Sequence, residues 1–134
     1  MNIKQTFVMI KPEGIQRHLV GQIIKRFERK GLKLVNIKSL IPDKTLVKEH
    51  YGHLSHKPFF NEMVDHLCSG MVICMIWEGI DSIDVCRRII GLTNPLEAAM
   101  GSIRADFAAD INANVIHGSD TEESAKKEIA LWFK

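Results

Sequence analysis

The residue with the clearest potential for chemistry is His117. It follows a short apolar pair and stands directly before Gly118, Ser119 and Asp120. This order predicts a short strand over residues 115–116, a tight turn, and a helix that begins at Ser119 or Asp120. A histidine at such a junction is either a packed turn residue or a reactive group held on a rigid support. The side chains around it decide between these two interpretations.

Five polar side chains stand near the ends of predicted elements and could gather around His117. Three are cations and two are uncharged hydrogen-bond donors: Lys11, Arg87, Arg104, Thr93 and Asn114. Taken singly, each is more often a solvated side chain or a member of a surface ion pair. Together at one edge of a sheet they would suit phosphoryl transfer, because negative charge spreads over the phosphoryl oxygens. Spacing alone does not prove that they converge.

Glu128 lies at the edge of the apolar stripe of the last predicted helix. It stands three residues after Ala125 and four before Trp132. A carboxylate there can reach back toward the start of the helix and orient His117, which fixes the tautomer and basicity of the imidazole. An exposed Glu128 paired with Lys127 fits the same pattern equally well.

Three histidines recur at three-residue spacing, namely His50, His53 and His56. This spacing can indicate zinc, but the three have no cysteine or fixed carboxylate partner. Packed or solvated histidines are therefore the favoured interpretation.

Aromatic residues follow these histidines. Phe59 and Phe60 fit a hydrophobic core, although one of them could lie at a rim and stack on a nucleic base, a contact that accepts any base. Tyr51 either donates a hydrogen bond from its hydroxyl group to a phosphate or packs against its neighbours.

The elements that must position these residues alternate along the chain. Apolar and β-rich runs predict strands over residues 6–10, 34–41, 71–77 and 115–116. Apolar residues at helical spacing predict helices between and after them. The order predicts an α+β fold of the ferredoxin-like, split βαβ type, with a four-stranded antiparallel sheet and helices on one face. Residues 92–113 show little periodicity and are predicted to form a long loop of functional or oligomer-contact type before the last strand.

The composition indicates one domain over residues 1–134. The chain is 46% hydrophobic and carries a formal net charge of +2, without a basic block of the kind that dominates nucleic-acid affinity. The three cysteines form no Cys-x-x-Cys pair and suit a reducing compartment. No signal-peptide pattern and no membrane-length apolar run is present, so a cytoplasmic protein without a membrane partner is expected. The P-loop and the Gly-x-Gly-x-x-Gly fingerprint are both absent.

Several segments together carry a resemblance to a known family. The pattern Asn-x-x-His-Gly-Ser-Asp over residues 114–120 is highly specific, and it follows matching segments at residues 6–14, 21–31, 56–60 and 91–95. On these segments the chain resembles the nucleoside diphosphate kinases from end to end. The resemblance implies a ferredoxin-like domain. It also implies a ping-pong kinase that passes the γ-phosphoryl group of a Mg2+-bound nucleoside triphosphate, chiefly ATP, to a nucleoside diphosphate.

The resemblance also implies a role for each matching residue. His117 would be the nucleophile that becomes phosphohistidine, supported by Glu128 and Ser119, with Lys11 as a further catalytic group. Phosphates and sugar would be held by Lys11, Tyr51, Arg87, Thr93, Arg104 and Asn114. Phe59 would stack on one side of the base, and Ile111 would face its other side. Mg2+ would be carried by the nucleotide phosphates and not by protein ligands. The family forms homo-oligomers, of which a hexamer is favoured here and a tetramer is the alternative.

The chain departs from the family pattern at a few positions. Glu13 stands where aspartate is usual, Met71 where proline is usual, and Leu92 where alanine is usual. Residues 100–104 read Met-Gly-Ser-Ile-Arg instead of Pro-Gly-Thr-Ile-Arg. None of these changes removes a catalytic group, and the lost proline is expected to loosen the long loop.

A second hypothesis is a catalytically silent regulatory or nucleic-acid-binding member of the family. Its signature would be a missing histidine, lysine or arginine at the positions named above. All of these residues are present, so this hypothesis ranks well below an active kinase. Weak binding to single-stranded nucleic acid is retained only as a side activity.

Overall fold

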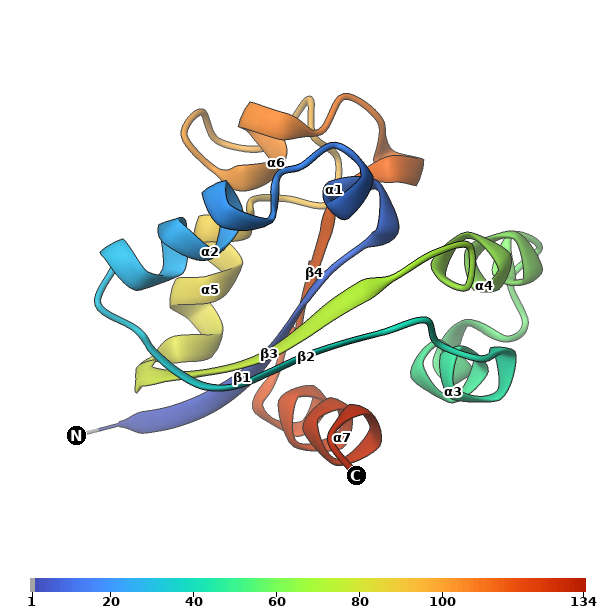
Figure 1. Cartoon of the computed structure of the whole chain (residues 1–134), viewed down its shortest axis with the longest axis horizontal. Helices are drawn as coiled ribbons and strands as arrows, with labels where there is room; N and C mark the ends of the chain where they lie inside the picture. Colours follow the sequence, from blue (N-terminus) through green and yellow to red (C-terminus); the bar gives the residue numbers. More distant parts are fainter. Residues whose placement is uncertain (1) are drawn as a thin grey trace.

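A computed structural model describes residues 2–134 and shows one four-stranded antiparallel sheet (Figure 1). The strands are β1 (Ile3–Ile10), β2 (Lys33–Leu40), β3 (Val72–Ile80) and β4 (Ile116–Gly118), in the order β2-β3-β1-β4. β1 pairs with β3 along its full length, from Ile3 opposite Ile80 to Ile10 opposite Ile73. This is the strand order of a split βαβ unit, and it confirms the predicted ferredoxin-like α+β class.

β1 is the centre of the sheet and is buried on both faces. Phe7, Val8, Met9 and Ile10 have no solvent exposure. Because successive side chains point to opposite faces, Val8 and Ile10 enter one core cluster while Phe7 and Met9 enter another. The continuous apolar run in the sequence thus reflects two cores, one on each side of the strand.

The helices cover both faces of the sheet, and the prediction that they lie on one face is wrong. The crossover helices α2 (Val20–Arg29) and α5 (Ser82–Ile90) share one face, where Phe27 stacks on Trp77 at 5.3 Å between ring centroids. The other face is covered by α3 (Lys44–His50), α4 (Phe60–Leu67) and α7 (Glu122–Trp132), as Figure 1 shows for α7. A second layer of helices is required because β1 and β3 carry apolar side chains on both faces of the sheet, and both faces must be covered.

The predicted long loop contains regular structure of its own. Residues 92–113 include the short helix α6 (Ile103–Phe107) and the 3-10 helix η2 (Ile111–Ala113). Two arginines fasten this segment to the rest of the fold. Arg26 forms an ion pair with Asp106 at 2.7 Å, and Arg17 donates to the carbonyl of Phe107 at 2.6 Å. Two further short elements are α1 (Pro12–Gln16) and η1 (Gly52–Leu54).

The last helix begins later than Ser119 or Asp120. Thr121 is its N-cap, and the Thr121 hydroxyl accepts a hydrogen bond from the amide of Ser124 at 3.0 Å. Ser119 is not the cap, because its hydroxyl donates to Glu128 at 2.7 Å, and its amide donates to the carbonyl of Phe7 at 3.0 Å, which ties it to β1. The fourth strand is likewise shifted, since it covers residues 116–118 and not 115–116.

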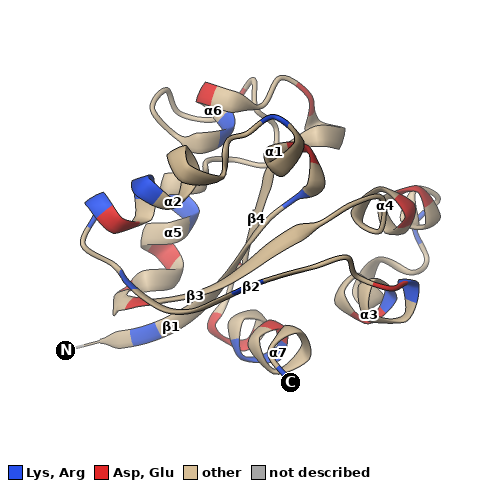
Figure 2. Cartoon of the chain, in the orientation of Figure 1, with Lys and Arg blue, Asp and Glu red and all other residues tan. Residues whose placement is uncertain are grey.

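Charged side chains of both signs are interspersed over the helices (Figure 2), which agrees with the small net charge of the chain. Within residues 2–134, no helix combines the length and the hydropathy that crossing a bilayer requires.

Candidate active site

One cavity of about 890 Å³ collects nearly all the residues that the sequence singled out. It opens between the α3–α4 region, the loop before β4, and the start of α7. The predicted residues on its wall are Lys11, Tyr51, Phe59, Arg87, Thr93, Arg104, Ile111, Asn114, His117 and Glu128. Ser119 alone is not on the wall, because it is buried behind Glu128. The convergence that spacing could not prove is therefore present.

His117 is held by a carboxylate. Its Nε2 lies 2.7 Å from Oε1 of Glu128, and the hydroxyl of Ser119 donates to the same oxygen at 2.7 Å. An ionised carboxylate only accepts, so Nε2 carries the proton and Nδ1 keeps its lone pair. Glu128 thus orients His117, and the alternative of an exposed Glu128 paired with Lys127 is wrong.

The ionisation of Glu128 follows from the same contacts. Burial by itself raises the pKa of a carboxyl group. Here the hydrogen bond and the charge of His117, with a further hydrogen bond from Ser119, outweigh burial and lower the pKa of Glu128 below its ordinary value. The carboxylate therefore stays charged at neutral pH and keeps the proton of His117 on Nε2.

Lys11 extends from the carboxyl end of β1 into the cavity. Its Nζ donates to Oδ1 of Asn114 at 2.8 Å, and Nδ2 of Asn114 donates to the carbonyl of Thr93 at 3.3 Å. Burial, and then the charge of Arg104, lower the pKa of Lys11 to about 8, while Glu13 partly offsets them. A bound phosphate would reverse this shift, because an anion favours the charged amine.

Two guanidinium groups bind the backbone around His117. Arg104 is 3% exposed and donates to the carbonyls of Ile116 at 2.6 Å and Gly91 at 3.2 Å. Arg87 donates to the carbonyl of Gly118 at 3.1 Å. Burial, and then the charge of Arg87, lower the pKa of Arg104 to about 10, so it remains a cation at neutral pH. Each guanidinium has five N–H groups, so donors remain for an anion in the cavity.

The mouth of the cavity is apolar on two sides. Phe59 is 45% exposed and Ile111 is 49% exposed, although both line the cavity. Large apolar side chains left this open at a cavity rim are suited to a flat aromatic ligand. Tyr51 lies deeper, and burial raises its pKa to about 12, so its hydroxyl remains a proton donor.

His50 belongs to the site and was not predicted as part of it. Its ring centroid lies 4.7 Å from that of His117, at an interplanar angle of 82°. The indole Nε1 of Trp132 donates to Nδ1 of His50 at 3.1 Å. Burial, and then the charge of His117, lower the pKa of His50 to about 3, which keeps it neutral. The available signal was a histidine on the buried face of a predicted helix, directly before Tyr51.

The three-residue histidine spacing does not form a metal site. Among the described residues, the only three potential ligands that gather are His50, His117 and Glu128, within 4.8 Å of one another. This group includes the proposed nucleophile, and His53 and His56 are not part of it.

A polarised histidine beside an amine and two guanidinium groups is an arrangement that suits the class of phosphotransferases. Comparison with known proteins agrees. The family profile described as nucleoside diphosphate kinase matches residues 4–134. The chain is 57% identical to nucleoside diphosphate kinase 1 of Nicotiana tabacum over 131 residues, which cover 98% of this chain and 88% of the tobacco protein.

Solved structures show the same relationship. The crystal structure of the nucleoside diphosphate kinase from Encephalitozoon cuniculi superposes with a TM-score of 0.95 at 50% identity, covering 96% of this chain and 88% of that one. The halophilic enzyme from Halobacterium salinarum in complex with CDP gives a TM-score of 0.95 at 45% identity, covering 98% and 88%. The chain belongs to the nucleoside diphosphate kinase family. It is a kinase that transfers phosphoryl groups between nucleotides, and a non-catalytic role has no support.

Replacing Glu128 with glutamine should slow the reaction, because an amide no longer fixes the proton of His117 on Nε2. A wrong tautomer in a comparable triad costs up to about 10⁴-fold, and we expect a loss of at least about tenfold here. Rapid-quench measurement of phosphoenzyme formation checks this. Glu123→Gln is the matched control, since it makes the same change at an exposed position on the same helix and cavity rim. Equal rates for the two variants would contradict the assigned role.

Nucleotide affinity should fall above pH 8 through Lys11. The free enzyme loses the charge of Lys11 as pH rises through its lowered pKa of about 8, whereas bound phosphate favours the protonated amine. By linkage, the dissociation constant of ADP should rise by up to about tenfold for each pH unit above 8. Calorimetric titrations between pH 7.5 and about 9.5 measure it. Lys11→Met should bind weakly with no such rise, and a flat wild-type profile would refute the assignment.

Proposed function

We propose that the kinase works by ping-pong exchange through a phosphohistidine on His117. Nδ1 attacks the γ-phosphorus of a nucleoside triphosphate, chiefly ATP, so that a nitrogen–phosphorus bond forms and the bond to the β,γ-bridging oxygen breaks. The nucleoside diphosphate leaves, and a second diphosphate then takes the phosphoryl group back. The observation that carries this proposal is the contact of Nε2 with Glu128, because it leaves Nδ1 as the reactive nitrogen.

The cations are proposed to bind the phosphates. Lys11, Arg87 and Arg104 meet at the inner end of the cavity, where their donors are poised for the charge that develops on the transferred group. Tyr51, Thr93 and Asn114 supply uncharged donors and acceptors for the phosphates and the sugar. Asn114 is 4% exposed and Tyr51 is partly buried, so both are held in place, which limits reorganisation during transfer.

The base is proposed to lie between Phe59 and Ile111 at the cavity mouth. Stacking on an aromatic face accepts any base, because every base has a π-face. This accounts for a kinase that serves many nucleotides with one site.

We propose that Mg2+ enters on the nucleotide phosphates. Mg2+ prefers oxygen ligands, and the one gathered group of potential ligands in the described chain contains two imidazoles and a single carboxylate. Such a group does not suit Mg2+. The ion would neutralise part of the negative charge of the phosphates. Lys11, Arg87 and Arg104 would neutralise the rest. Removal of Mg2+ by a chelator should therefore suppress phosphoryl labelling of the protein by ATP. The same chelator should release no metal from the nucleotide-free protein.

A cytoplasmic location is also proposed. Cys68, Cys74 and Cys86 are all free thiols. Burial raises the pKa of Cys74 and of Cys86 to about 12, so both persist as unreactive thiols of the kind that a reducing compartment preserves. Cell fractionation tests this proposal.

Labelling should identify the nucleophile. Incubation with γ-labelled ATP should leave an acid-labile, alkali-stable phosphoryl group on the protein, and His117→Ala should abolish both the label and nucleotide exchange. His53→Gln is the control, because His53 is an exposed histidine on the wall of the same cavity. It should retain the label. Label in the His117→Ala variant would sink the assignment.

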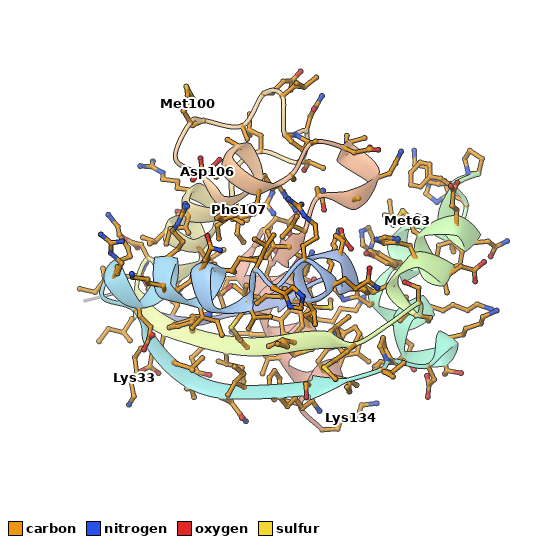
Figure 3. The ribbon with its side chains drawn as sticks, turned by 45° about the horizontal axis from the view of Figure 1, so that its top comes forward. Lys33, Met63, Met100, Asp106, Phe107 and Lys134 are labelled. Atoms are coloured by element: carbon orange, nitrogen blue, oxygen red, sulfur yellow. The ribbon has the colours of Figure 1, made fainter. Side chains whose placement is uncertain are left out.

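A homo-oligomer is proposed, with a hexamer favoured over a tetramer. Large apolar side chains are exposed on and after the edge strand β2, at Val35, Ile37 and Ile41, and on the loop before α6. In that loop Leu96 is 89% and Met100 is 97% exposed, and Figure 3 shows Met100 pointing outward. Exposed apolar patches of this sort mark interaction surfaces.

Light scattering on the purified protein should give a mass near six times the 15.2 kDa of one chain. Four times that mass would favour the tetramer. A monomer at micromolar concentration would contradict the proposal.

A further inference from the structure

The chain makes a strained turn directly before β4. Val115 has a φ of 77°, and the amide of Ile116 donates to the carbonyl of Asn114 at 2.9 Å, which is the bond of a γ-turn with positive φ. For a β-branched residue this conformation is an outlier, and such strain persists only where the surrounding structure holds it. Asn114, which holds Lys11, lies on one side of the turn, and His117 lies on the other. The turn therefore sets their relative positions.

Groups from α1 and the residue before it hold both polar atoms of Val115. Its carbonyl accepts from the amide of Lys11 at 2.8 Å, and its amide donates to Oε2 of Glu13 at 3.0 Å. Gly14 permits this close approach, since a Cβ there would lie 3.2 Å from Cγ1 of Val115 and 2.7 Å from Cγ2 of Ile10. Val115 is fully buried, so its amide depends on the Glu13 carboxylate for a partner among the described residues.

Glu13 is in turn held from α4. Nε2 of His66 donates to Oε1 of Glu13 at 2.9 Å, and the carboxylate is largely enclosed, with 13% of its side chain exposed. His66 also lines the nucleotide cavity, one turn after Met63, which Figure 3 labels on the same helix. A single carboxylate therefore ties together α1, the strained turn and the helix that follows Phe59.

Resting on the proposed function, we propose that Glu13 and His66 act together as positioning residues for phosphoryl transfer. His66 holds the Glu13 carboxylate against the amide of Val115. This keeps the strained turn in the conformation that places Asn114 and Lys11 opposite His117. The same link joins α4 at the base end of the cavity to the phosphate end, so nucleotide contacts at the mouth act on the relative positions of Lys11 and His117.

Glu13 also acts through its charge. Burial, and then Arg104, lower the pKa of Lys11, and the negative charge of Glu13 works against both. The charged groups that act on Lys11 are Glu13 from α1 and Arg104 from α6, and the charge of Lys11 in turn acts on His50 from α3. Other titratable groups on the same cavity wall include Tyr51, Arg87, His117 and Glu128. Glu13 is the carboxylate whose charge raises the pKa of Lys11. Loss of its charge should therefore shift the alkaline limb of the activity profile to lower pH.

Variants at His66 separate positioning from folding. His66→Phe keeps a ring but cannot donate, and we expect the rate of phosphoenzyme formation to fall about tenfold while KM for ATP changes less than about threefold. His66→Gln retains a donor and should recover most of this rate. Asp65→Asn, an exposed neighbour on α4, is the control and should match the wild type. A wild-type rate in His66→Phe, or no recovery in His66→Gln, would overturn the proposal.

Variants at Glu13 test the coupling. Glu13→Ala should lose about a hundredfold in rate, and the double variant with His66→Phe should be no slower than Glu13→Ala alone, because the two residues act through one contact. Multiplied losses would overturn the proposal. Glu13→Gln keeps an acceptor without the charge and should show the alkaline shift, whereas an unchanged pH profile would refute the charge effect.

The two proposals fail in distinguishable ways. If wild-type protein takes no label from ATP, or if His117→Ala does, the proposed function fails. If the wild type is labelled on His117 and the Glu13 and His66 variants react at its rate, only this inference fails. Each variant is compared at equal folded concentration, checked by circular dichroism, so a purely structural role would lower the yield without changing the rate per folded chain.

Discussion

The pairing of β4 with β1 is the constraint on which the rest of the site depends. Met9 lies opposite His117, and the carbonyl of Val115 accepts from the amide of Lys11. β1 is buried on both faces and bonded along both edges, so its carboxyl end cannot shift without disturbing two cores. The amine and the imidazole thus come from neighbouring strands of one rigid sheet. The backbone sets the spacing of the two residues, and the hydrogen bond from Lys11 to Asn114 places the amine.

The site concentrates positive charge in a protein that has little net charge. Lys11, Arg87 and Arg104 share a cavity, and burial with mutual repulsion lowers the pKa values of Lys11 and Arg104. These cations interact unfavourably before a ligand arrives. Polyphosphate relieves that cost, because each cation then gains an opposite charge at short range. In the proposed mechanism a few placed cations recognise the phosphates, where a general basic surface would also attract other polyanions.

Two histidines lie against each other in this cavity and have different roles because their partners differ. His117 donates to a carboxylate, which leaves Nδ1 with a lone pair. His50 accepts from the indole of Trp132 and is kept neutral by burial. Trp132 also stacks on Phe7 of β1, at 6.0 Å between ring centroids. The core of the second face thus extends directly into the chemistry of the site.

The sequence by itself determined the number and order of the strands, the crossover helices and the set of candidate reactive groups. Apolar periodicity and the Asn-x-x-His-Gly-Ser-Asp segment report local preferences and a highly specific family pattern, and both are readable without coordinates. The long apolar run of β1 also contained the evidence for helices on both faces, although the strand order alone suggested one.

Only the tertiary structure decided which side chains meet. Glu128 faces His117 because α7 begins at Glu122 and packs across β1, which the ambiguous caps at Ser119 and Asp120 did not reveal. His50 and His66 reach the cavity through the packing of α3 and α4. The strain at Val115 is held by Glu13, 102 positions away in the sequence. Such contacts depend on how the buried faces of distant segments pack against each other. The spacing of residues along the chain does not specify the distances between their side chains.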